Sequence, residues 1–248
     1  MLTEDCIPRT KDCAKSRTAL RQNTQMIAPL VLSFDLDDTL WPVGPVIAAA
    51  EADLYAWLRE RHPRAVSGHS VESMQALRAA VSKRFPEHGH DLTFLRHRAL
   101  KDLFAAAGLA ESPADEALEV FLTARNRVEL YDDVRPALIR LRSRYRLFAL
   151  SNGNADLGRC GIADLFAGHI TARGAGFAKP DARIFARLAH DAGVDAAQVL
   201  HIGDDPQTDV VGARQAGMQA LWLNRTLRAW PGEFPPPPRT ITSLAQIV

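Results

Sequence analysis

The chain has 248 residues, of which 47% are hydrophobic, so it is long enough to bury one sizeable core or a core domain with a smaller companion. Its formal net charge of +1 gives no field that would draw it to nucleic acid or to an anionic membrane surface, and no apolar run is long enough to span a bilayer. We therefore predict a cytoplasmic protein with neither kind of partner, and its three cysteines, an odd number, suit a reducing compartment. The sequence carries no signal for an oligomeric state.

The first 27 residues are polar and lack the periodicity of a helix or a strand, which predicts a disordered N-terminal extension outside the fold. Cys6 and Cys13 in this extension have no companion cysteine or histidine pair at zinc-ligand spacing. Met26 stands just before the first hydrophobic run, and we hypothesise that translation starts there instead. The intact mass of the natively expressed protein tests this hypothesis, and a full-length mass would refute it.

The segment from residue 43 to residue 128 is predicted to be helical throughout. Apolar residues recur in it at helical spacing, and Gly108 stands where the third helix ends. The fourth helix is expected to have Ser112 as its N-cap and Pro113 at its first position. The predicted helices are Val46–Arg61, Ser70–Phe85, Asp91–Ala107 and one that begins at Ser112. We predict that 43–128 is a helical cap domain inserted into a core domain made of 28–42 and 129–248.

Strands and helices alternate in the remainder of the chain. This order predicts an α/β fold with a doubly wound, Rossmann-like parallel sheet. The predicted strands are Leu30–Phe34, Arg146–Leu150, Val199–Ile202 and Gln219–Leu223, and the predicted helices are Asp133–Arg144, Asp181–Ala192 and Thr208–Ala216. Residues 234–238 are expected to form a stiff surface excursion, after which Ser243–Val248 returns to cover the core.

Polar and charged residues follow three of these strands at the point where each strand ends. Ligands of open α/β sheets bind just beyond the carboxyl ends of the strands, so these side chains are expected to share one crevice. Carboxylates, a hydroxyl and an ammonium group at one crevice can bind a metal ion and a phosphate. The segments are Asp35-Leu-Asp37-Asp-Thr39, Ser151-Asn152 and Gly203-Asp204-Asp205 with Asp209, together with Lys179-Pro180 between the second and the third.

This set of motifs, in this order, resembles the signature of the haloacid dehalogenase superfamily of phosphatases: Asp-x-Asp-x-Thr, then Ser or Thr, then Lys, then Gly-Asp-x-x-x-x-Asp. The resemblance covers roughly residues 28 to 225, and all four parts are present. An all-helical insert directly after the first motif is similar to the first type of cap in that family. Such a cap closes over the crevice and excludes water from the reacting phosphate.

The resemblance implies a role for each motif in phosphoryl transfer. Asp35 would attack phosphorus and form an aspartyl-phosphate, and Asp37 would protonate the leaving oxygen and later take a proton from water. Ser151, the main-chain N–H of Asn152 and the Lys179 ammonium would bind phosphate oxygens. Thr39 would hold the turn between Asp35 and the insert.

A Mg²⁺ cofactor is also implied, with the carboxylates of Asp35 and Asp204 and the main-chain carbonyl of Asp37 as its ligands. Asp205 is expected near the metal through a water molecule. For Asp209 we favour a structural role, as the cap of the helix that begins beside it. His201 is expected to be a core histidine, because no thiol or second histidine accompanies it.

Candidate substrate contacts in the cap are Arg96 and Arg98, with His88, His90 and Trp41 as further wall residues. Arginine and aromatic groups could hold and stack a planar ring. Two residues at positions i and i+2 of a helix point in different directions, so at most one of the two arginines can face the crevice.

Segments 34–42, 90–98, 151–154 and 203–205 are similar to a bacterial branch of the family that dephosphorylates flavin mononucleotide and a phosphoribitylamino-uracil precursor of riboflavin. We therefore predict a phosphomonoester hydrolase acting on a small phosphorylated metabolite. One alternative is a dehalogenase, which keeps the nucleophilic aspartate and needs neither the metal nor the second aspartate. Another is a non-catalytic binding protein on the same scaffold, although none of the motif residues is lost.

Overall fold

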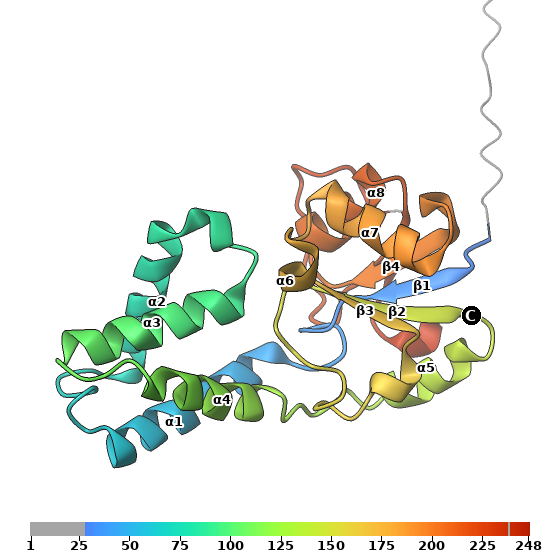
Figure 1. The fold of residues 1–248 in the computed structure, drawn as a ribbon. Helices are drawn as coiled ribbons and strands as arrows, with labels where there is room; N and C mark the ends of the chain where they lie inside the picture. The colour runs from blue at the N-terminus through green and yellow to red at the C-terminus, as the bar shows by residue number, and fades with distance from the viewer. Residues whose placement is uncertain (1–27, 238) are drawn as a thin grey trace, which may run out of the picture.

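The structure is a computed structural model that describes residues 28–237 and 239–248. The expectations for residues 1–27, Met26 and the two N-terminal cysteines included, lie outside the described residues. Within the described part, six parallel strands form one sheet in the order β3-β2-β1-β4-β5-β6 (Figure 1). The strands are β1 (Val31–Phe34), β2 (Arg146–Ser151), β3 (Gly168–Thr171), β4 (Val199–Gly203), β5 (Gln219–Leu223) and β6 (Thr240–Ile241). The predicted parallel, doubly wound sheet is confirmed.

Helices cover both faces of this sheet, which explains why the strands are apolar on both sides. Leu32 and Phe34 pack on one face with helix α5 (Val134–Arg142) and the C-terminal turn Leu244–Gln246. Val31 and other strand residues pack on the opposite face with the helices α6 (Ala172–Ala175), α7 (Ala182–Ala192) and α8 (Gly212–Gln215). The predicted return of the C-terminal segment to the core is confirmed by buried Leu244 and Ile247.

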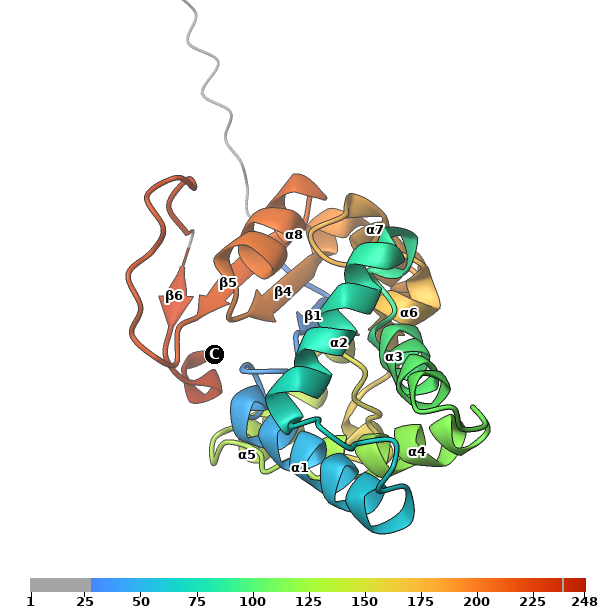
Figure 2. The ribbon, with the colours of Figure 1, turned by 90° about the vertical axis from the view of Figure 1, so that its left-hand side faces the viewer.

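Residues 43–125 form helices only, and these helices lie to one side of the sheet (Figure 1). They are α1 (Val43–Arg61), α2 (Val71–Arg84), α3 (Leu92–Ala106) and α4 (Pro113–Arg125), with a short 3-10 turn at Pro86–His88. The helices pack round a core of their own, with α1 against α4 and α2 against α3 (Figure 2). None of the helices in the described residues is long and apolar enough to cross a membrane.

Polar side chains cap two of the helices in the insert. The side chains of Ser70 and Asp91 accept hydrogen bonds from the first turns of α2 and α3. Ser112 was expected to cap α4, but its backbone is already helical and its side chain makes no cap bond. Helix α1 begins three residues earlier than predicted, because the Val43 N–H donates to Oδ1 of Asp38 at 2.9 Å.

The strands β3 and β6 were not predicted from the sequence. Both are short edge strands, and only one of the four residues of β3 is fully buried, so neither carries the continuous apolar run of the central strands. The helix expected at 208–216 is a π-helical turn at Pro206–Val211 that continues into α8. It begins two residues before the predicted start, which changes the roles of the nearby aspartates.

The direction in which the chain adds strands to the sheet reverses at β1. From β1 the chain moves outward through β2 and β3, and it returns to the other side of β1 with β4. The crevice at such a reversal is where doubly wound sheets bind their ligands. The residues directly after β1 and β4 therefore lie at the position that the fold favours for a site.

Candidate functional site

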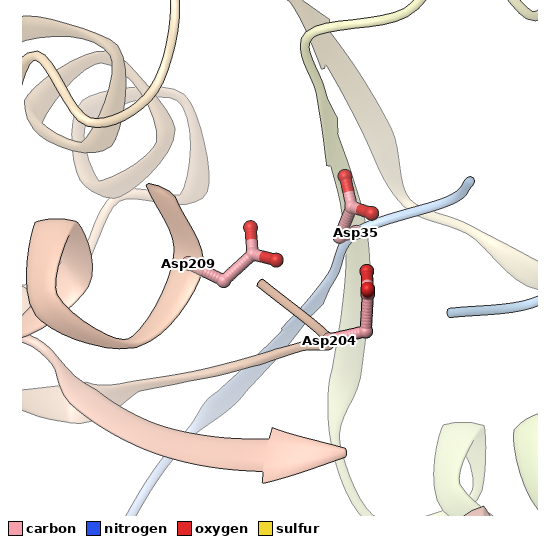
Figure 3. A group of neighbouring side chains, drawn as sticks. All are labelled: Asp35, Asp204 and Asp209. Atoms are coloured by element: carbon pink, nitrogen blue, oxygen red, sulfur yellow. The ribbon is translucent and has the colours of Figure 1, made fainter. Parts of the chain in front are cut away.

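Three carboxylates meet at the carboxyl ends of β1 and β4 (Figure 3). Asp35 directly follows β1, Asp204 directly follows β4, and Asp209 lies in the π-helical turn after β4. One oxygen of each lies within 4.8 Å of an oxygen of the other two. Asp35 and Asp209 are buried and Asp204 is half-buried, so the cluster sits at the inner end of the crevice.

Lys179 brings positive charge to this cluster. Its Nζ donates to Oδ1 of Asp35 and to Oδ1 of Asp209, each at 2.6 Å, and only 4% of the residue is exposed. The side chain of Asn152 fixes the Lys179 backbone, since its Oδ1 accepts from the Lys179 N–H at 2.7 Å and its Nδ2 donates to the Lys179 carbonyl at 2.9 Å. Asn152 therefore contributes by positioning Lys179, a role that the sequence did not indicate.

The carboxylates outnumber the positive charges around them, and their pKa values reflect this. Burial, together with the charges of Asp209 and Asp38, raises the pKa of Asp204 to about 7. Burial also raises the pKa of Asp35 well above its usual value, although Lys179 opposes the shift. Burial disfavours the Lys179 ammonium, but Asp209 and Asp35 outweigh it and raise the Lys179 pKa. The site is short of positive charge, and a divalent cation bound by oxygen atoms fits this donor set.

The structure corrects which of the two aspartates after β4 caps the helix. Asp205, expected near the metal, is the helix cap: its Oδ1 accepts from the N–H groups of Gln207 and Thr208 at 2.9 and 2.7 Å. Asp209, expected to be the cap, instead accepts the Lys179 ammonium and the Asp205 N–H. The reason is the earlier helix start, which puts Asp205 at the N-cap and turns Asp209 toward the crevice.

His201 is a buried strand residue, as expected. Its Nδ1 lies 3.0 Å from the Ser33 hydroxyl, and its Nε2 lies 3.2 Å from Oδ1 of Asp209. Burial lowers the pKa of His201, although Asp209 opposes the shift. His201 therefore supports Asp209 from within the core.

Asp37 lines the same small cavity as the three-carboxylate cluster, but its carboxylate is held by other residues. Trp41 donates its indole N–H to Oδ1 of Asp37 at 2.9 Å, and Arg125 donates from Nη2 to both carboxylate oxygens at 2.7 and 2.6 Å. Trp41 was expected in the cap wall, but it is fully buried and holds Asp37. Arg125 is the last residue of α4 and is 1% exposed. Its role was not predicted from the sequence, because an arginine at a helix end is ordinary.

Two adjoining cavities share Asp37 and Gly153 in their walls. The smaller, of about 140 Å³, is lined by the motif residues, with Ser151, Asn152 and Lys179 among them. The larger, of about 420 Å³, lies between the helical insert and the sheet, and Arg96 and Arg125 are in its wall. The smaller cavity has the residues for a phosphate, and the larger one has room for the group that carries it.

The remaining candidates from the cap do not line the larger cavity. Arg98 pairs with Asp102 at 2.5 Å, whereas Arg96, two residues earlier, is buried and lies over the Phe121 ring. The expectation that at most one of the two arginines faces the crevice agrees with this placement. His88 stacks on Phe94 with ring centroids 3.9 Å apart, and His90 lies next to His88.

Comparison with known protein families matches residues 30–217 to the haloacid dehalogenase-like hydrolases. The chain belongs to this family. It is 35% identical over 196 residues to the 5-amino-6-(5-phospho-D-ribitylamino)uracil phosphatase YigB of Escherichia coli K12, and the match covers 77% of this chain and 82% of the relative. It is also 32% identical to a phosphoserine phosphatase of Thermus thermophilus, over 80% of this chain and 90% of the relative.

Among solved structures, a 2-haloacid dehalogenase from Pseudomonas syringae pv. Tomato DC3000 superposes with a TM-score of 0.83. The two are 38% identical, and the match covers 89% of this chain and 96% of that one. The predicted family and its core fold are thus confirmed, and the phosphatase relatives support the predicted enzyme class, a phosphatase of this family.

Proposed function

We propose that the protein is a Mg²⁺-dependent phosphomonoesterase that acts through an aspartyl-phosphate on Asp35. The observation that carries this proposal is the arrangement of Asp35, Asp204 and Asp209 round a buried lysine at the reversal point of the sheet. A phosphate monoester resists attack because its oxygens are anionic, so a hydrolase must neutralise them and supply a nucleophile. This crevice supplies both.

The smaller cavity would hold the phosphate. Lys179 would pair with phosphate oxygens while keeping Asp35 in place, and Ser151 and the Asn152 N–H would donate further hydrogen bonds. Asp35 would attack phosphorus as the alkoxide leaves, and water would later hydrolyse the acyl phosphate. Asp37, in the wall shared by both cavities, stands where the leaving oxygen must pass and would transfer the proton.

The residues present fit a bound Mg²⁺. Asp35 and Asp204 would supply carboxylate oxygens, and Asp37 would supply its main-chain carbonyl, since its side chain is held by Trp41 and Arg125. Asp209 would fix Lys179 and the Asp205 loop at the border of this site. The ion would supply charge neutralisation for the phosphate oxygens and for the acidic cluster.

The helical residues 43–128 would act as the cap, and the cavity beneath them would receive the leaving group. A volume of about 420 Å³ lies in the range of roughly 300–1,000 Å³ that holds drug-sized ligands. This size favours a heterocyclic or nucleotide-like leaving group over a serine or a three-carbon sugar. We therefore propose a riboflavin-type substrate, either flavin mononucleotide or the phosphoribitylamino-uracil precursor that the E. coli relative is named for.

A haloacid dehalogenase is the second candidate, because the relative from Pseudomonas syringae carries that name at 38% identity. An aspartate that displaces a halide forms an ester, and one further carboxylate is enough to activate the water that hydrolyses it. That reaction does not account for both Asp204 and Asp209 beside Asp35, or for Asp37 at the cavity junction. Phosphoryl transfer accounts for Asp204 as a metal ligand and for Asp37 as the acid for the leaving oxygen.

The test is phosphate release from p-nitrophenyl phosphate and flavin mononucleotide, with Mg²⁺ and with EDTA, by the wild type and by Asp35→Asn. We expect turnover that needs Mg²⁺ and is lost in the variant. Chloride release from 2-chloropropionate in EDTA, without phosphatase activity, would establish the dehalogenase instead. Folded, Mg²⁺-loaded protein that turns over neither class would leave a binding protein on this scaffold.

A further inference from the structure

An ionic cluster built round a buried glutamate lies in the helical insert beside the larger cavity. Glu51 of α1 is 3% exposed, and its Oε1 accepts from Nη1 of Arg78 on α2 at 2.7 Å and from Nη2 of Arg96 on α3 at 2.9 Å. The Arg96 guanidinium also lies 3.3 Å from the ring centre of Phe121 on α4. One carboxylate thus holds two arginines from different helices in fixed positions at the cavity wall.

This cluster carries one positive charge more than its partners cancel. Burial lowers the pKa of Arg96 to about 10, which still leaves it protonated at neutral pH. The other ion pair of the same wall, Arg125 with Asp37, is balanced. The Arg96 side chain is 9% exposed, whereas the Arg78 side chain is 34% exposed, so the excess charge is placed at the cavity wall and not sealed in the core. An oxygen acceptor of a substrate in the cavity would complete the pairing of the two arginines.

The two guanidinium groups also have donors to spare. An arginine has five N–H donors, and in the described part of the chain each of these two gives one hydrogen bond, to Glu51. Their other nitrogens are not among the buried polar atoms that lack a partner in the described residues, and both side chains line the larger cavity. N–H donors that are held in fixed positions in a cavity wall can recognise an oxygen acceptor of a bound ligand.

We propose that Arg78 and Arg96, held by Glu51, bind an oxygen acceptor at the far end of the leaving group. This inference rests on the proposed phosphatase function and goes beyond it, since it states which chemistry the substrate presents away from its phosphate. The acceptor is either a carboxylate or the carbonyl edge of a ring, and both pair with a guanidinium fork. Glu51 is a positioning residue that keeps the two forks aimed at the cavity.

The test compares four substrates whose leaving groups differ in this acceptor: phenyl phosphate, which has none, 4-acetylphenyl phosphate, 4-carboxyphenyl phosphate and flavin mononucleotide. We would measure kcat/KM with Mg²⁺ for the wild type, Arg96→Gln and Arg78→Gln. The control variant is Arg84→Gln, because Arg84 lies on α2 as well but pairs with Asp102 and does not line the cavity. Thermal melting checks that each variant is folded, and the partly exposed Arg78 carries the test if the Arg96 variant is not.

Loss of a hydrogen bond to a charged group predicts a fall of about 10- to 100-fold in kcat/KM for at least one acceptor-bearing substrate. The fall on phenyl phosphate, and for Arg84→Gln on all four substrates, should be below about threefold. A larger loss on the carboxylate identifies an anionic acceptor, and a larger loss on the acetyl group and the flavin identifies a neutral carbonyl. Equal losses on all four substrates, or none, overturn the inference. Folded, Mg²⁺-loaded wild-type protein inactive on all four substrates would instead overturn the proposed function.

Discussion

Replacing Asp204 by asparagine should stabilise the metal-free protein at pH 8. The Asp204 carboxylate is buried beside Asp209 and Asp38, and its closest cation, Arg228, is 3.2 Å away and half exposed. Ionisation of Asp204 is therefore unfavourable in the fold. Asparagine has the same shape without the charge, and its one side-chain oxygen can keep the hydrogen bond from Arg228 while its NH2 group donates to the Thr39 hydroxyl.

The size and the pH range of this effect follow from the pKa of Asp204, which is about 7 in the fold and 3.8 in the reference state. The folded pKa is the higher one, so the stability from this group is present below pH 3.8 and is lost as the pH rises toward 7. The full difference corresponds to about 4 kcal/mol of unfolding free energy. We expect Asp204→Asn to gain about 2 to 4 kcal/mol at pH 8, because asparagine gives up part of the attraction to Arg228.

Urea unfolding in EDTA, for wild type and Asp204→Asn at pH 5 and pH 8, measures this difference directly. The gain at pH 5 should be less than half of that at pH 8. Adding Mg²⁺ at pH 8 should stabilise the wild type and leave the variant nearly unchanged, because the variant lacks a ligand. A variant that is no more stable than the wild type at pH 8, or equally more stable at both pH values, would refute the electrostatic reasoning.

Three further predictions concern the same crevice. Mg²⁺ must displace the proton of Asp204, so its apparent Kd by calorimetry should rise by up to about tenfold per pH unit below pH 7; a flat profile would contradict this. Arg125→Gln removes the arginine that holds Asp37, so kcat/KM should fall about 10- to 100-fold on an alkyl phosphate. The fall on p-nitrophenyl phosphate should be smaller, because its leaving group needs little protonation. Equal losses on both substrates would speak against a role of Arg125 in positioning Asp37. Gly153→Ala puts a Cβ 2.5 Å from Oδ2 of Asp37. The displaced carboxylate should lower kcat at least about tenfold, while the melting temperature changes little. A variant that keeps the wild-type kcat would contradict this.

The motif residues could be predicted because they depend on local sequence and on one rule of topology. A short apolar run followed by Asp35 or by Ser151 defines a buried strand and its carboxyl end. Parallel strands then bring these ends to one edge, whatever the loops between them do. The edge strands β3 and β6 lack such a run, and the sequence did not reveal them.

The roles of Asp205 and Asp209 depend on a detail finer than this rule. Both are short acidic residues near a helix start, and either could cap it. The structure decides because Asp209 lies against Gly203, where an added Cβ would be 2.3 Å from its carboxyl group. Gly203, the glycine of the fourth motif, thus makes room for the Asp209 carboxylate that holds Lys179. The spacing of the motif residues in the sequence does not show this contact.

The site residues that could not be assigned from the sequence lie in the helical insert or at its end. A strand fixes which side chains reach its carboxyl end, but a helix can turn about its axis, and its buried face is set by the helices that pack on it. Arg96 and Arg98 were equivalent in the sequence, and it is Phe121 and Glu51, 25 and 45 residues away in the chain, that select Arg96. In the proposed function, substrate choice would therefore rest on long-range pairings between helices, whereas the chemical step would rest on strand ends. The same division predicts that changes at 51, 78 or 96 alter which ester is cleaved, and changes at 35 or 179 alter whether any is cleaved.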